Sequence, residues 1–156
     1  MYSKEEKKNI NIVFWEGFKH YSSPKRRELG KNKKWLMQNT GIKAIDLKFH
    51  IDNSLASVSI DVVSKSLDSK LGYWNKLLGL KTLLNDAFAQ EVVWDDIYTL
   101  ESGKDIIRIG VYLHEVDILN KDCWPQVYDF FFLNMITLED WLEEYRDIIR
   151  VQKNHS

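Results

Sequence analysis

Two short runs of alternating apolar and polar residues constrain the fold of this chain more than any other feature. Within residues 44–51 every second residue is apolar, namely Ile45, Leu47, Phe49 and Ile51. Within residues 56–62 the apolar positions are Ala56, Val58, Ile60 and Val62. A period of two predicts half-buried strands, because successive side chains of a strand point to opposite faces of a sheet.

A short turn between these runs predicts that they pair as an antiparallel hairpin. Asp52-Asn53 is a suitable two-residue turn because both residue types tolerate positive φ. The register predicted from this turn places Asp46 opposite Ser59 and Lys48 opposite Ser57. Both apolar faces then lie on one side of the hairpin.

Apolar residues at helical spacing flank the hairpin. Ser3-Lys4-Glu5-Glu6 is a capping box that opens a first helix, which we expect to end near Ser23 because Pro24 follows. A second helix is predicted over 67–88, with an inner stripe of Leu71, Trp74, Leu77, Leu78, Leu84 and Phe88. Asp122 and Pro125 open a last helix whose apolar residues recur every three or four positions up to Ile149.

A second strand pair completes the predicted fold. Residues 92–98 and 105–113 are strand-like around Ser102-Gly103, and residues 35–37 suit a short extra strand. The order α-ββ-α-ββ-α predicts an α+β fold, with a mainly antiparallel sheet of four to five strands and helices on one face. Gly41, which precedes the first strand, is expected to have positive φ. The predicted core includes Phe49, Val58, Leu77, Phe131 and Leu138.

Composition predicts one soluble domain over residues 1–156, with a frayed tail over 151–156. The chain has 156 residues, is 44% hydrophobic and has a single cysteine, Cys123. One cysteine forms neither an internal disulfide nor, by itself, a zinc site. The N-terminus is charged and no apolar run is long enough to span a membrane, so we expect a cytoplasmic protein without membrane contact.

Positive charge is concentrated near the N-terminus. Residues 1–48 carry 12 Lys and Arg against 5 Asp and Glu, although the whole chain has a net charge of −1. Most of this excess lies in a predicted loop over about 24–34, which holds Lys25, Arg26, Arg27, Lys31, Lys33 and Lys34. Such a localised positive field attracts phosphates or acidic protein surfaces.

These basic residues suggest a non-enzymatic binding or accessory domain. The cations would neutralise a nucleic-acid backbone, with Trp35 or Tyr21 as a ring on which a base stacks. An acidic protein surface is the alternative partner, and the acidic stretch Glu139-Asp140 with Glu143-Glu144 would suit the loop within the chain or in a dimer. The same lysines would also serve simply to solvate a loop.

A catalytic alternative rests on the polar face of the first hairpin. Asp46, Lys48 and Asp61 are two carboxylates and a lysine, the groups with which metal-dependent nucleases hold Mg²⁺ and activate water. Asp46-Leu47-Lys48 has the acid-x-Lys spacing of such enzymes, but no suitable acid precedes it. An ordinary solvent-exposed sheet face would explain the same residues without any catalytic role. A degenerate remnant of a nuclease is a further alternative.

No other cofactor or metal site is predicted. The four histidines are scattered without metal-ligand spacing. A third class of function is a structural homodimer, in which Trp141, Tyr145 and Ile148 widen the apolar surface of the last helix.

Spaced aromatic motifs carry a resemblance to a known family. They are Phe14-Trp15, Trp35, Thr40-Gly41-Ile42, Trp94, Ile107-Arg108-Ile109, and Trp124-Pro125 with Tyr128 and Phe130. Together they resemble an uncharacterised bacterial family, domain of unknown function four-two-six-eight, over most of the chain. The resemblance implies a domain found alone or at the C-terminus of longer bacterial proteins with a nuclease-like part. It implies no catalytic residues, and Asn39 replaces the basic residue expected before Thr40.

Overall fold

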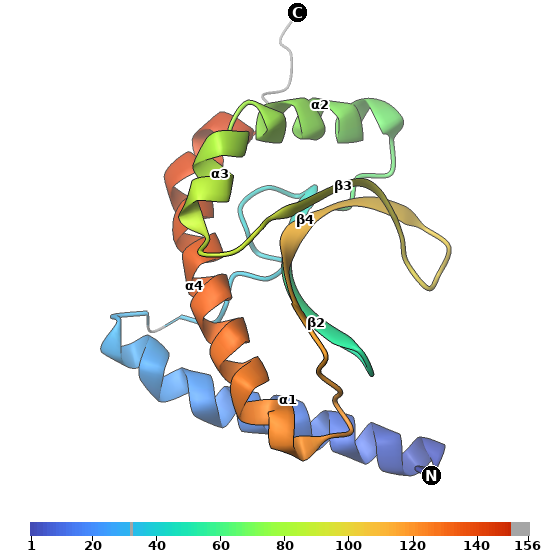
Figure 1. Cartoon of the computed structure of the whole chain (residues 1–156). Coiled ribbons are helices and arrows are strands. Elements are labelled where there is room, and N and C mark those ends of the chain that lie inside the picture. Colours follow the sequence, from blue (N-terminus) through green and yellow to red (C-terminus); the bar gives the residue numbers. More distant parts are fainter. Residues whose placement is uncertain (32, 151–156) are drawn as a thin grey trace, which may run out of the picture. The chain divides into compact units, whose positions relative to one another are not determined.

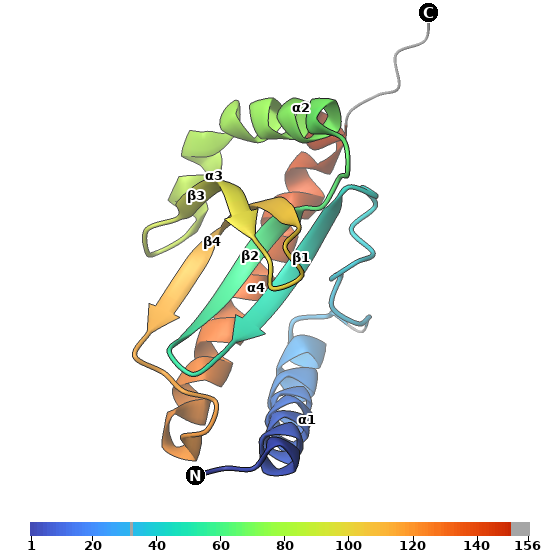
Figure 2. The ribbon, with the colours of Figure 1, turned by 90° about the vertical axis from the view of Figure 1, so that its right-hand side faces the viewer.

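The fold is α+β, as the sequence predicts, and contains a four-stranded antiparallel sheet (Figure 1). The structure, a computed structural model, describes residues 1–31 and 33–150. Its elements are α1 (Lys4–Glu28), β1 (Ile45–Ile51), β2 (Leu55–Val62), α2 (Leu67–Leu78), α3 (Lys81–Ala87), β3 (Val93–Thr99), β4 (Asp105–His114), the 3-10 turn η1 (Lys121–Cys123) and α4 (Trp124–Ile149). The strand order is β1-β2-β4-β3, so β2 and β4 are the inner strands (Figure 2).

Two compact units divide the chain, and each has its own core. The first comprises Met1–Trp35, Phe49–Ser57 and Tyr112–Leu133. The second comprises Leu36–Lys48, Val58–Val111 and Asn134–Ser156.

Helix α1 is longer than predicted. The capping box is present, with the Ser3 hydroxyl accepting from Glu6 N–H and the Glu6 carboxylate accepting from Ser3 N–H. The helix, however, continues through Pro24 to Glu28, so the prediction that it ends near Ser23 is wrong. Gly30 stops it instead: this residue has φ of 75°, and bonds from Gly30 N–H to Arg27 C=O and from Lys31 N–H to Arg26 C=O close the helix end.

This longer helix moves part of the predicted basic loop into regular structure. Lys25, Arg26 and Arg27 lie in the last turn of α1. The connection to the sheet therefore begins only after Leu29, the C-cap residue. The suggested strand over 35–37 is also absent, because Met37 has φ of 44°, outside the strand region.

The predicted second helix is two helices. The chain turns at Gly79-Leu80, where Gly79 N–H still bonds to Asn75 C=O and Leu80 is buried. This break changes which of the predicted stripe residues are buried. Leu77 and Leu84 are buried as predicted, whereas Leu71 and Leu78 are 48% and 38% exposed.

Aromatic rings form the core of the first unit. Phe49 of β1 lies 5.1 Å from Phe18 of α1 and 4.8 Å from Phe131 of α4, measured between ring centres. Phe14 lies 5.1 Å from Tyr128, whose hydroxyl donates to the Phe14 carbonyl at 2.7 Å. Residues of both helices therefore pack against Phe49, and the predicted burial of Phe49 and Phe131 is confirmed.

Aliphatic residues form the core of the second unit. Val58, Ile60, Val62, Ile107 and Ile109 of the strands are buried, together with Leu138 and Leu142 of α4. The predicted burial of Val58, Leu77 and Leu138 is thus confirmed. Gly41 has φ of 85°, as predicted, and its carbonyl accepts a bond from Arg150 at 3.0 Å.

The first hairpin has the predicted faces but a different register. The carboxylate of Asp52 accepts from the N–H groups of Ser54 and Leu55, so the turn is centred on Asn53-Ser54. Val63 N–H bonds to Ala44 C=O at 2.8 Å, which pairs these two residues across the hairpin. Two steps along, Asp46 lies opposite Asp61, where the predicted register had Ser59.

Candidate functional site

Four exposed cations form a basic surface on the first unit. They are Lys25, Arg27, Lys33 and Lys34, and we call this set the basic surface. Lys25 and Arg27 belong to the last turn of α1, while Lys33 and Lys34 follow it in the connecting segment. The two other predicted cations differ: Lys31 is half-buried and Arg26 is buried.

Arg26 binds to the protein itself. Its guanidinium lies 3.8 Å from the centre of the Trp35 ring, and its Nη2 donates to the Lys33 carbonyl at 2.9 Å. The residue is only 7% exposed. Arg26 therefore joins the helix end to the segment that carries Lys33 and Lys34, and we call this contact the Arg26–Trp35 clamp.

Trp35 is a packing residue of the first unit. Its ring is nearly parallel to Phe18, with an interplanar angle of 12°, and lies edge-on to Phe49 and Phe132. These contacts surround the indole with rings of α1, β1 and α4. The spaced aromatic motifs of the sequence thus build a core here.

Tyr21, the second candidate stacking ring, is also engaged. The Lys25 ammonium lies 5.0 Å from its ring centre, and its hydroxyl donates to the Asp129 carboxylate. Burial, followed by the hydrogen bond to Asp129 and its negative charge, raises the pKa of Tyr21 to about 12. The hydroxyl is therefore protonated at neutral pH.

The sheet residues Asp46, Lys48 and Asp61 lie in the second unit. Asp61 accepts from Arg108 Nε at 2.9 Å and from Arg108 Nη2 at 2.8 Å, and also from the Ser59 hydroxyl at 2.8 Å. Both side chains of the ion pair are 3% exposed, and the Tyr98 ring lies 4.1 Å from the guanidinium. Both oxygens of Asp61 are therefore used inside the protein.

Asp46 is electrostatically coupled to this ion pair. Burial, followed by the negative charge of Asp61, raises the pKa of the Asp46 carboxyl, while Lys48 and Lys104 oppose the shift. Among residues 1–31 and 33–150, no group of three His, Cys, Asp or Glu side chains is placed to hold a metal ion. The arrangement favours a structural role for Asp61, and the catalytic hypothesis stays a prediction.

Arg108 is the main site residue that sequence reasoning missed. It is the single charged residue in the run Ile106–Val111, all of which is buried. A charge inside a buried strand requires a partner of opposite sign, so the run itself signals an ion pair. Choosing Asp61 as that partner requires the strand order and register.

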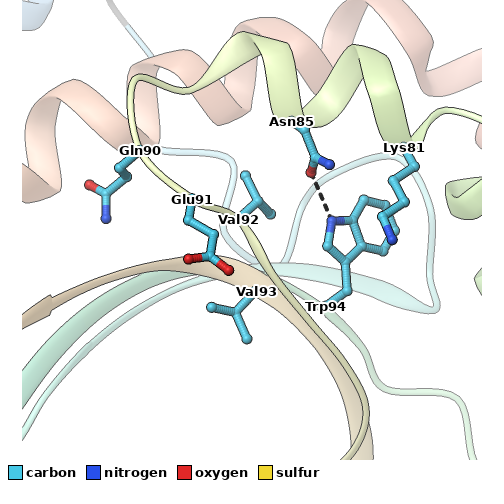
Figure 3. A pocket seen from close by; sticks show the side chains of 7 residues that line it. All are labelled: Lys81, Asn85, Gln90, Glu91, Val92, Val93 and Trp94. Atoms are coloured by element: carbon cyan, nitrogen blue, oxygen red, sulfur yellow. Dashed lines mark hydrogen bonds between the residues drawn. The ribbon is translucent and has the colours of Figure 1, made fainter.

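A shallow hollow of about 540 Å³ lies between α3 and the start of β3 (Figure 3). Trp94 Nε1 donates to Asn85 Oδ1 at 2.8 Å, and Lys81 lies 5.4 Å from a ring centre of Trp94 (Figure 3). Glu91 and Val93 line the same hollow. Within the lining of the hollow, Trp94 thus contacts both Asn85 and Lys81.

The apolar surface proposed for a homodimer is smaller than predicted. Trp141 is 4% exposed and packs 5.1 Å from Tyr145, so it does not widen an outer surface of α4. Ile148 is 54% exposed.

Comparison with known proteins gives a family and no activity. A search of curated proteins and a search of solved structures each found no match. Within the described part of the chain, no helix combines the length and apolar character that crossing a membrane requires. The family model described as "Domain of unknown function (DUF4268)" matches residues 10–146, which include most of α1, the whole sheet and most of α4. The chain therefore belongs to the DUF4268 family.

Proposed function

We propose that this protein is a non-enzymatic binding domain that holds a nucleic acid through its phosphate backbone. The observation that carries the proposal is the basic surface, four exposed cations on one helix end and the segment clamped to it. Cations grouped in this way contact consecutive phosphates, and each contact releases counterions from the nucleic acid.

The composition of this segment supports the same partner. Between Tyr21 and Met37 the only acidic residue is Glu28. Within this stretch of sequence the cations therefore add to one another's field with little opposing charge. Contacts to phosphates carry no sequence information, so we expect the binding to be sequence-independent.

A titration of fluorescent duplex and single-stranded oligonucleotides tests the proposal. Non-specific binding of nucleic acid has dissociation constants of about 1–100 μM at physiological salt, and it is tighter at about 50 mM salt. We expect fluorescence anisotropy to rise with protein concentration for random sequences. No binding at ~50 mM salt and ~100 μM protein contradicts the proposal.

The same titration separates a nucleic acid from an acidic protein partner. An acidic protein surface would depend on the same cations but would leave the oligonucleotides unbound.

A divalent-metal thermal shift addresses the nuclease hypothesis independently. A Mg²⁺ or Mn²⁺ ion held by Asp46 and Asp61 would raise the melting temperature by mass action.

A further inference from the structure

The aromatic rings nearest the basic surface are already occupied. A base that stacks on Trp35 has to displace the Arg26 guanidinium, 3.8 Å from the ring centre, or one of the surrounding phenylalanine rings. Displacing Arg26 also breaks its bond to the Lys33 carbonyl. Trp35 is therefore unsuited to stack with a base.

Tyr21 is blocked in the same way. Lys25 covers its ring at 5.0 Å, and the ring centres of Phe18 and Tyr128 lie 6.5 Å and 5.6 Å away. Its hydroxyl is held by Asp129. Proteins that prefer single strands use rings with a free face, because stacking of each base adds substantially to binding. Of the two candidate rings beside the basic surface, Trp35 and Tyr21, neither keeps a face free of other side chains.

Resting on the proposed function, we infer that the ligand is double-stranded nucleic acid, held through backbone phosphates with no stacked base. A B-form duplex carries one negative charge per roughly 1.7 Å of its axis, about twice the density of each of its strands. A fixed group of cations without stacking rings gains most from the ligand with the higher charge density.

The Arg26–Trp35 clamp makes Arg26 a positioning residue in this interaction. Through its bond to the Lys33 carbonyl, Arg26 ties the connecting segment to the last turn of α1. Lys33 and Lys34 are thereby held near Lys25 and Arg27 before a ligand arrives. Prior ordering of this kind reduces the entropy lost when a rigid duplex binds.

Charge-preserving variants test the positioning role. Arg26→Lys keeps the charge but loses the planar group that stacks on Trp35, while Lys43→Arg keeps the charge at an exposed position of the second unit, outside the basic surface. We expect Arg26→Lys to weaken duplex binding at least threefold and Lys43→Arg to change it less than twofold. Equal effects of the two variants would contradict the positioning role, and circular dichroism checks that both are folded.

Three ligands of equal length test the inference on the unmodified protein. They are a duplex, one of its strands, and an abasic strand with the same number of phosphates. We expect the duplex to bind most tightly and the abasic strand to bind within twofold of the normal strand. If a base stacks on the protein, the abasic strand should bind about 5- to 150-fold more weakly than the normal strand. Such a loss, or single-strand binding as tight as duplex binding, overturns the inference but leaves the proposed function intact. Failure of all three ligands to bind overturns the proposed function itself.

Discussion

The guanidinium of Arg26 lies 3.8 Å from the centre of the Trp35 ring and donates to the carbonyl of Lys33. Arg26 thus contacts neighbouring residues of the chain, while the four cations of the basic surface, Lys25, Arg27, Lys33 and Lys34, remain exposed. The buried Arg26 and the exposed cations of the basic surface should therefore differ in how substitutions change the stability of the protein as well as its binding.

Arg26→Ala should lower the free energy of unfolding by about 2 kcal/mol, because it removes a cation–π contact and a buried hydrogen bond. Arg27→Ala, next in the chain but exposed, should change it by less than about 0.5 kcal/mol. Urea denaturation of both variants checks the difference. Equal midpoints would show that Arg26 contributes no more than a surface residue.

The buried pair of Asp61 and Arg108 should show strong coupling. Asp61→Ala or Arg108→Met alone leaves an unpaired charge inside the protein and should cost about 3–5 kcal/mol. The double variant should be more stable than the sum of the two single effects predicts, since neither charge is then left without its partner. Additive losses in a double-mutant cycle would show that the two side chains do not stabilise each other.

Two glycines should respond to alanine with opposite signs. Gly41 has φ of 85°, and an added Cβ would lie 3.2 Å from the Arg146 side chain, so Gly41→Ala should destabilise by about 1 kcal/mol or more. Gly72 lies within α2, and an added Cβ would meet no atom within 4 Å beyond its chain neighbours and the nearby backbone of its own helix. Gly72→Ala should therefore stabilise the protein by about 0.5–1 kcal/mol. Thermal melts compare them, and a neutral Gly41→Ala contradicts the prediction.

The Asp52 carboxylate should make stability depend on acid pH. Burial raises its pKa, but hydrogen bonds from His50, from the Ser54 and Leu55 N–H groups and from the Ser54 hydroxyl outweigh it, and the pKa falls from 3.8 to about 2. The unfolded chain therefore binds more protons between these values, so this contribution is complete above pH 3.8 and is lost as the pH falls toward 2. Asp52→Asn should be less stable than the parent at pH 7, with a difference that shrinks below pH 4. A difference independent of pH would contradict this assignment.

The sequence predicts the faces of the elements better than their ends or pairings. Phe49 and Phe131 are buried because alternation and helical spacing directly report which side is apolar. The predicted end of α1 near Ser23 is wrong because it rests on Pro24 alone, whereas the helix continues to Glu28 and is followed by Gly30 with positive φ. Pro24 and Gly30 are both residue types that can end a helix. Only the hydrogen bonds from the Gly30 and Lys31 N–H groups back to the last turn show that Gly30 does so here.

For the candidate site residues too, the sequence predicts local features better than contacts between distant parts of the chain. The sequence identifies the cluster that contains Lys25, Arg27, Lys33 and Lys34, since charge density is local information. It does not show that Trp35 packs among core rings, because Phe49 and Phe132 belong to other elements of the fold. It also does not show that Arg26 is buried against Trp35. The sequence likewise identifies Asp61 without its partner, because pairing it with Arg108 requires knowing that β2 and β4 are neighbours in the sheet.

The salt dependence of duplex binding tests the central claim most directly. A plot of log K against log salt should lose about 2.7 units of slope in Arg27→Gln/Lys33→Gln/Lys34→Gln, if each cation neutralises one phosphate. The control Lys43→Gln/Lys65→Gln/Lys76→Gln removes the same charge from exposed positions of the second unit and should keep the parent slope. Equal slopes for the two triple variants, or no duplex binding by the parent protein, would contradict the account.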